Sequence, residues 1–335
     1  MKNKIVIATL VSLLGFTACS DDSGQEPQPV RATAVRLEGA IGLSTRAVIG
    51  SGYNEDLKVC FARRDETGVS TDTYGGWGAY SAVRSGGGGS RPIIFNQTQV
   101  YPADGSRIHL HGYYPADSVG VVESNASTGK VTFTIDGKTD MMATGRITAS
   151  GKTAAAAEVP VACTFYHLLT QLSFVCYSNH ADKWGEITKI EAADIPLKQE
   201  LDWTAEAADV KLSSVANSET GTLQVQGIDY PLAVLQVGQD DPLPGEDKAK
   251  GYILLPVSDG LGASGKALWL NITTTKDGKG SETATTFRVP VSAEGGFQAG
   301  SRHVLSLFFT DGIGIEVTRV GVIPWIAQEE PEIPM

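Results

Sequence analysis

Few residues of this 335-residue chain have the types and spacing that metal chemistry requires. His109 and His111 stand two residues apart in an alternating stretch, so on a strand they would share one face and point toward one ion. No further His or Cys stands near them in the sequence, and strand histidine pairs more often belong to a solvated face. We therefore expect no metal site and no cofactor.

Catalytic chemistry has no stronger support. The sequence contains no Gly-x-Ser-x-Gly elbow and no compact Ser/His/Asp or Cys/His grouping that would activate a nucleophile. Glycoside hydrolysis needs two carboxylates about 5 to 9 Å apart. The acidic pairs Asp240-Asp241 and Glu329-Glu330 stand in loop-like or terminal segments, where solvated charge is the simpler interpretation. The sequence therefore predicts no catalytic residue and no enzyme, and a glycosidase is the enzymatic alternative.

The clearest chemical signal is the thiol of Cys19. Lys2 and Lys4 precede an apolar run, Ile5–Phe16, which is shorter than the roughly 20 residues of a membrane-spanning helix and has the proportions of a signal-peptide core. Cys19 follows small residues directly, which resembles the lipobox of bacterial lipoproteins, where this Cys is acylated. We expect residues 1–18 to be a signal peptide, Cys19 to carry lipid such as palmitate, and residues 19–30 to be a tether.

Two acidic residues, Asp21 and Asp22, follow this Cys and resemble the surface-export signal of lipoproteins from the Bacteroides group. They predict a lipid anchor in the outer membrane and a location at the cell surface. An ordinary signal peptide with an incidental Cys19 is the alternative. Both interpretations exclude a cytoplasmic enzyme.

Charge and cysteine content narrow the class of protein further. A net charge of −11 excludes nucleic acid as a partner. Three cysteines follow residue 19, an odd number whose spacing fits no zinc motif. Cys163 and Cys176 either form a cross-strand disulfide or are buried as small apolar side chains, as Cys60 can be. The fold therefore does not depend on disulfides.

The chain after Arg31 has the pattern of β-structure throughout. Apolar and polar residues alternate, as expected for strands with one buried face, and Gly, Asp and Asn mark turns between them. Strands are expected at 33–41, 57–61, 108–113, 130–135, 172–177, 187–195, 252–257, 267–272, 286–291, 303–308 and 315–326. Thr144–Glu158 is rich in Gly, Thr, Ser and Ala and is expected to be a linker. The sequence predicts an all-β protein of two sandwich domains, residues 31–157 and 158–335.

Two composition features have structural rather than chemical interpretations. Gly86–Gly89 is expected to be a flexible loop and not a phosphate cradle, because no helix follows it. Five tryptophans are scattered singly, which is typical of core or domain-junction positions in sandwiches. Gathered on one exposed face, they would instead form a carbohydrate-stacking platform. An outer-membrane glycan-binding lipoprotein is therefore the alternative class of binding protein. The tryptophans are Trp77, Trp184, Trp203, Trp269 and Trp325.

A series of short motifs resembles a known family by its order and spacing. The series resembles the fimbrillin-like proteins of Bacteroidales, which are subunits, accessory proteins and tip proteins of type V pili. The motifs are Ser44-Thr45-Arg46-Ala47, His111–Pro115, Asp140–Ala143, Phe165–Phe174, Phe297–His303 and Ile313–Trp325.

The resemblance implies two transthyretin-like β-sandwich domains in tandem, and export as a lipoprotein. It implies that a trypsin-like protease cuts after an Arg near the N-terminus, so that the first strand leaves and a strand of another fimbrial subunit takes its place. Arg46 is the expected cleavage site, because it follows the strand Val35–Leu43; a cut at Arg31 or Arg36 would leave most of that strand attached. An ordinary surface arginine is the alternative interpretation of Arg46.

The expected donor segment is Ile315–Ile326, although Gly321 and Pro324 interrupt it. The acidic, Pro-rich stretch after Trp325 is short, so a tip, anchor or accessory subunit fits at least as well as a stalk subunit. The expected partners are other fimbrial subunits and a host or microbial surface ligand. The sequence therefore favours a non-enzymatic fimbrial subunit or adhesin of the outer membrane and cell surface.

Overall fold

The computed structural model describes seven stretches of the chain. They are residues 33–42, 49–67, 74–123, 126–152, 159–204, 210–312 and 314–324. Cys19, Arg46 and Trp325 lie outside the described residues, as do the signal peptide and the tether expected at 1–30. In the part of the chain that is described, no helix is long and apolar enough to cross a membrane.

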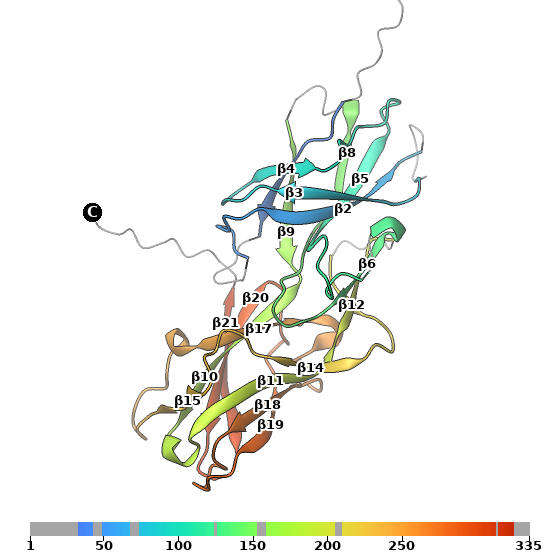
Figure 1. Cartoon of the computed structure of the whole chain (residues 1–335). Coiled ribbons are helices and arrows are strands. Elements are labelled where there is room, and N and C mark those ends of the chain that lie inside the picture. Colours follow the sequence, from blue (N-terminus) through green and yellow to red (C-terminus); the bar gives the residue numbers. More distant parts are fainter. Residues whose placement is uncertain are drawn as a thin grey trace, which may run out of the picture. The chain divides into compact units, whose positions relative to one another are not determined.

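The described residues form strands joined by turns and short 3₁₀ segments, which confirms the prediction of an all-β protein (Figure 1). The strands are β1 (Leu37–Ile41), β2 (Leu57–Asp65), β3 (Gly78–Arg84), β4 (Arg91–Phe95), β5 (Arg107–Tyr114), β6 (Lys130–Thr134), β7 (Met142–Thr144), β8 (Ile147–Ser150), β9 (Val161–His167), β10 (Leu169–Ser178), β11 (Glu186–Pro196), β12 (Lys198–Asp202), β13 (Ser213–Ser214), β14 (Thr220–Gln224), β15 (Leu232–Ala233), β16 (Leu235–Gln236), β17 (Lys250–Pro256), β18 (Leu268–Thr274), β19 (Thr285–Val291), β20 (Ser301–Phe309) and β21 (Ile315–Pro324). The 3₁₀ segments are η1 (Ala126–Thr128), η2 (Ala181–Lys183), η3 (Glu246–Lys248) and η4 (Ser258–Gly260).

Strands β1–β5 and β7–β9 form one sheet that closes on itself. β2, β3, β4, β1, β9, β7 and β5 are hydrogen-bonded neighbours in that order, and β5 pairs back to β2. These seven strands therefore form a barrel, to which β8 adds by pairing with β5. Apolar side chains that alternate along each strand fill the interior, as in small barrels generally. They include Leu37, Val59, Phe61, Ile93, Leu110 and Phe165, all buried.

The C-terminal strands form a β-sandwich of two five-stranded sheets. One sheet has the order β16-β10-β20-β21 with β17 also on β10, and the other has β14-β11-β18-β19 with β15 on β11. Both sheets contribute to one core, with Leu172, Phe174 and Leu305 from the first and Ile190 and Leu270 from the second. This packing is the expected result of strands that are apolar on one face.

A small sheet of three strands, β13-β12-β6, joins segments that are far apart in the sequence. β6 pairs with β12 over five positions, from Lys198 opposite Thr134 to Asp202 opposite Lys130. Its apolar side chains share a second core with Tyr113, Leu168 and Trp203. The fold is thus a barrel, a sandwich and this bridging sheet.

The prediction of a linker at Thr144–Glu158 is wrong for the first half of this segment. Thr144 ends β7, and Ile147–Ser150 form β8, which pairs with β5 over four positions. Residues 153–158 lie outside the described residues. Only Ile147 in β8 is strongly apolar, so the pairing with β5 decides the local structure more than the sequence pattern does.

Candidate functional site

The first strand of the barrel is the feature of the described structure most relevant to the expected strand exchange. The two predicted site residues, Cys19 and Arg46, lie outside the described residues. β1, however, is described, and residues 43–48, which include Arg46, follow it in the sequence.

β1 lies between two strands that it joins into one wall. It pairs in parallel with β9 at five positions, from Leu37 opposite Val161 to Ile41 opposite Phe165. It pairs antiparallel with β4 at three positions, and the last pair is Gly39 opposite Arg91. Further backbone bonds extend this pairing: the Gly42 N–H donates to the Phe165 carbonyl at 2.7 Å. Without β1 the barrel would have two unpaired edges, β4 and β9.

The side chains of β1 alternate as the sequence predicts. Val35, Leu37 and Ile41 point into the barrel core and are 6%, 2% and 5% exposed, whereas Arg36 is exposed. Gly39 also lies on the inward face. A Cβ at this position would lie 2.8 Å from Ile93 Cδ1 and 3.3 Å from Phe165 Cε2. These two side chains therefore already fill the space above Gly39.

Arg84, at the end of β3, is fully buried and contacts β1 directly. Its Nε donates to the Gly39 carbonyl at 2.9 Å. Its two terminal nitrogens donate to the carbonyls of Ser85, Gly87 and Gly89, at 3.0, 3.1 and 2.8 Å. Burial lowers the pKa of the guanidinium, and the charge of neighbouring Arg91 lowers it further. An arginine remains charged under such conditions, so five donors are held in a fixed fork.

This role of Arg84 was not predicted from the sequence. The run Gly86–Gly89 was interpreted as a flexible loop, whereas two of its carbonyls turn inward to bind the guanidinium. Gly87 and Gly89 have φ values of +110° and +71°, which a glycine adopts without strain. An Arg separated by one residue from a run of four glycines is the signal in the sequence that would have pointed to this arrangement.

The expected donor segment, Ile315–Ile326, is mostly part of its own sandwich. β21 pairs antiparallel with β20 at nine positions, with one irregularity between Ser306 and Leu307. Ile315, Val317 and Val320 pack against the sandwich core, and Val322 is 50% exposed. Residues 325–335 lie outside the described residues. In this structure, β21 forms one edge of its sheet.

The two strand histidines are buried and not solvated, contrary to the expectation from the sequence. His109 Nε2 lies 3.0 Å from Glu66 Oε1, and its Nδ1 lies 3.0 Å from the Thr148 hydroxyl. The His111 ring stacks on Trp203 with centroids 5.5 Å apart. Burial above all, together with nearby positive groups such as the Arg64 guanidinium, lowers the pKa of His111 to about 3.

The aromatic side chains near His111 form a packed cluster and not a platform. Trp77 and Trp203 lie on His111, at centroid distances of 5.9 and 5.5 Å, so these two tryptophans are not isolated as the sequence indicated. The Arg64 guanidinium lies over the rings of Tyr74 and Trp77. Trp203 is only 4% exposed, so its face is not available for stacking with a sugar.

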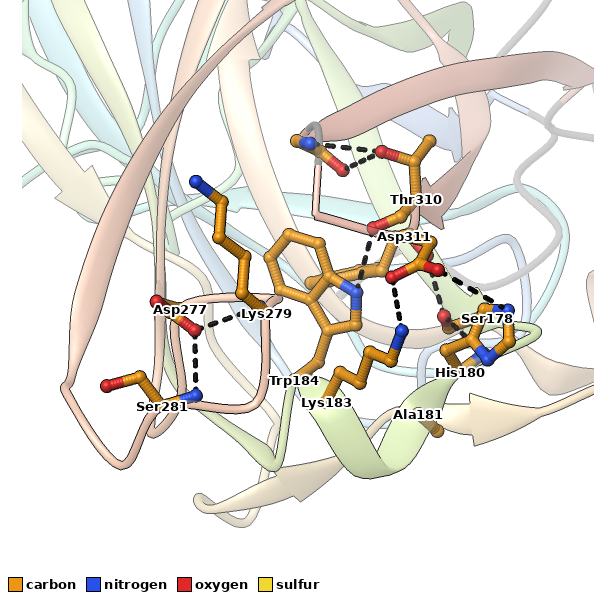
Figure 2. A network of polar contacts seen from close by, with 12 residues as sticks. Ser178, His180, Ala181, Lys183, Trp184, Asp277, Lys279, Ser281, Thr310 and Asp311 are labelled. Carbon is orange, nitrogen blue, oxygen red and sulfur yellow. Dashed lines mark hydrogen bonds and ion pairs between the residues drawn. The ribbon is translucent and has the colours of Figure 1, made fainter.

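Figure 2 shows polar contacts at three turns of the sandwich. Lys183 Nζ donates to Asp311 Oδ1 at 2.6 Å, and the buried Trp184 indole N–H donates to the Thr310 carbonyl at 3.2 Å. Asp277 accepts from two backbone N–H groups of its own hairpin, those of Lys279 and Ser281. The Lys183 and Trp184 contacts join two turns, whereas the Asp277 contacts lie within one hairpin. Among the described residues, no group of three His, Cys, Asp or Glu is placed to hold a metal ion.

The three cysteines described by the structure are free thiols. Cys163 lies in β9 of the barrel, and Cys176 lies in β10 of the sandwich. Burial raises the pKa of both thiols to about 12. Of the two alternatives left open by the sequence, the structure has the separate thiols and not the disulfide.

Comparison with known proteins agrees with this architecture. The fimbrillin-like family matches residues 45–325. The chain therefore belongs to the fimbrillin-like family. No curated protein matches it.

Three crystal structures of candidate cell adhesion proteins share the fold. The one from Bacteroides uniformis has 16% identity and a TM-score of 0.56, with 89% of this chain and 100% of that chain covered. The one from Bacteroides ovatus has 14% identity and a TM-score of 0.50, with 89% and 99% covered. The one from Parabacteroides distasonis has 11% identity and a TM-score of 0.50, with 90% and 98% covered.

Proposed function

We propose that this protein is a surface-exported lipoprotein that acts as a fimbrial subunit and assembles by protease-triggered strand exchange. Cleavage after Arg46 would sever β1 from the rest of the barrel, and a strand of another subunit would replace it. The observation that carries the proposal is the position of β1: it is one wall strand of a closed barrel and precedes the proposed cleavage site in the sequence. Family membership supports the same role.

The burial of β1 explains why replacement, and not simple loss, is expected. Three aliphatic side chains buried at about 1.5–3 kcal/mol each stabilise the strand by roughly 5–9 kcal/mol, before its hydrogen bonds are counted. A cut strand would therefore stay in place until a competitor offers equivalent contacts. The competitor gains hydrogen bonds to both β4 and β9, which are otherwise exposed edges.

The position of β21 bears on which subunit this is. To act as a donor, Ile315–Ile326 would have to leave β20, with nine paired positions, and withdraw three apolar side chains from the sandwich core. A subunit that accepts a strand at the β1 position and retains β21 stands at one end of an assembly. This supports a tip, anchor or accessory subunit, the expectation drawn from the sequence.

The lipid and the domain division complete the proposal. Acylation of Cys19 would hold the uncut subunit at the outer membrane, and cleavage after Arg46 would separate the lipid from the barrel. Two transthyretin-like domains, residues 31–157 and 158–335, remain the proposed organisation. A boundary near residue 157 assigns β9 to the second domain, although β9 pairs with β1 of the barrel.

The direct test is cleavage by a trypsin-like protease. Purified protein is digested, the new N-terminus is sequenced, and the assembly state is followed by size-exclusion chromatography with and without partner subunits. We expect a new N-terminus at Ala47 and assembly only after the cut. Arg46→Gln is the uncleavable variant, and Arg36→Gln is its matched control. Assembly of the Arg46→Gln variant, or cleavage elsewhere without assembly, contradicts the proposal.

A further inference from the structure

We propose that the β1 position selects a partner strand with glycine in the Gly39 register between two large aliphatic residues, and that Arg84 sets this register. The inference rests on the proposed function, because it describes the strand that would replace β1. It names the partner by its chemistry: an extended segment with the pattern large-x-Gly-x-large, parallel to β9 and antiparallel to β4.

The requirement for glycine comes from the barrel core. Phe165 and Ile93 approach the Gly39 Cα so closely that a Cβ would lie 3.3 and 2.8 Å from them. Ile93 Cδ1 is the end of a flexible side chain and can move, so alanine is tolerated with some loss. The Phe165 ring is also close to Gly112, because a Cβ on Gly112 would lie 3.0 Å from Phe165 Cζ. A branched residue at the Gly39 position therefore overpacks this region.

The requirement for large neighbours comes from the same strand. Leu37 and Ile41, two residues before and after Gly39, point into the core with 2% and 5% exposure. A strand with polar residues at these positions would bury them without partners. Slippage by one residue would turn the whole apolar set outward, so the register is strongly constrained.

Arg84 supplies the hydrogen bond that fixes the register. The β1–β4 ladder ends at Gly39 opposite Arg91, where β4 begins, and the Arg84 Nε provides an additional donor to the Gly39 carbonyl at that end. The other bonds of the guanidinium go to Ser85, Gly87 and Gly89, in its own hairpin. These bonds do not depend on β1. Arg84 therefore stays aimed into the vacated position, as a donor organised in advance for the incoming carbonyl.

This chain's own β21 fits the pattern poorly. Aligning Gly321 with Gly39 places Ile323 in the position of Ile41, but Arg319 in the position of the buried Leu37. A charged side chain there would lie in the barrel core. The site therefore favours a strand from a different subunit over one from a second copy of this chain.

The test measures how strongly peptides compete with the resident β1 for its position in the full-length chain after cleavage at Arg46. A fluorescent peptide of residues 33–42 is compared with its Gly39→Ala, Gly39→Val and Arg36→Ala versions and with a peptide of residues 315–324. We expect the Gly39→Val peptide to bind at least about 10-fold more weakly than the native peptide. The affinity of the Gly39→Ala peptide should lie between those of the native and the Gly39→Val peptides. The Arg36→Ala peptide should bind like the native one. Equal binding of the Gly39→Val peptide, or native-like binding of the 315–324 peptide, overturns the inference.

The part played by Arg84 is measured by a double-mutant cycle. A peptide with a thioamide at Gly39, a weaker acceptor, is tested on the natural chain and on Arg84→Lys and Arg84→Met variants. The thioamide should weaken binding to the natural chain several-fold and have no such effect on the variants. Equal thioamide effects on all three chains overturn the role of Arg84.

A measurement on the uncut chain separates this inference from the proposed function. Gly39→Val should lower the melting temperature clearly more than Arg36→Val, whether or not a protease ever cuts after Arg46. If cleavage fails and this difference is found, strand exchange is wrong and the selectivity of the β1 position stands. If cleavage occurs but Gly39→Val costs no more than Arg36→Val, the selectivity is wrong and strand exchange stands.

Discussion

Replacing Leu37 by alanine tests whether the buried face of β1 holds this strand in the barrel. Leu37 is 2% exposed and lies opposite Ile93 on β4 and Val161 on β9. Leu-to-Ala changes in well-packed cores cost about 2–5 kcal/mol. If this cost applies to local opening of β1, the open population rises by roughly 30-fold to several thousand-fold, at about 1.4 kcal/mol per factor of ten.

Hydrogen exchange of the uncut full-length chain, followed by mass spectrometry, measures this opening segment by segment. Peptides covering β1, β4 and β9 should exchange faster together, because β4 and β9 lose the same partner. Peptides covering β20 and β21 should be unchanged and serve as an internal reference. Arg36→Ala on the exposed face is the matched control, with an expected effect within about 0.5 kcal/mol. Equal acceleration in both variants, or acceleration in β1 without β4 and β9, would refute the assigned packing.

Two further predictions concern the buried His111 of β5 and the buried Trp184 of the sandwich. The pKa of His111 is about 3 in the folded state, below its ordinary value of 6.5, so the folded state loses stability as the pH falls from about 6.5 toward 3. At pH 4.5 this residue accounts for a loss on the order of 3 kcal/mol. Urea unfolding gives the free energy of unfolding at pH 7 and at pH 4.5. The difference between the two values should be smaller for His111→Phe than for the natural chain. His180→Phe, a change at an exposed position, should show the same difference as the natural chain. Trp184→Phe removes the indole donor to the Thr310 carbonyl and leaves a gap, so urea unfolding should show a loss of about 1–3 kcal/mol in the free energy of unfolding. Trp269 is only half-buried, so Trp269→Phe should lose less. An equal loss in the two variants contradicts the role of this bond.

The strands that the sequence predicts well are those in which one face meets a core. The expected strand at 267–272 overlaps β18, which alternates buried and half-buried residues, and the expected strand at 108–113 lies within β5. Even β10, whose ten residues are all buried, was found from its apolar run. In β18 the burial itself alternates with period two, whereas β5 and β10 are buried along almost their whole length, so their sequence patterns predict the strands but not the burial of both faces.

The elements that escaped prediction depend on contacts distant in sequence. β8 has one strong apolar residue and exists because β5 offers it an edge. His109 and His111 were expected in solvent, but Glu66 and Trp203 come from other parts of the chain to cover them. Arg84 is the clearest case: a buried arginine requires several carbonyls to converge on it, and no local pattern encodes that convergence.

β1 and β21, the first and last described strands, differ in the edges that their removal would expose. This difference favours β1 as the exchangeable strand. Removing β21 would expose a single edge, that of β20, and an incoming strand would gain partners on one side only. Removing β1 exposes two facing edges, β4 and β9, together with the space occupied by Leu37 and Ile41. An incoming strand therefore gains two ladders and a core position at once, which is the stronger driving force for replacement. The closed barrel thus holds β1 firmly, and after the proposed cut a competing strand would have to match both ladders and the core contacts to replace it.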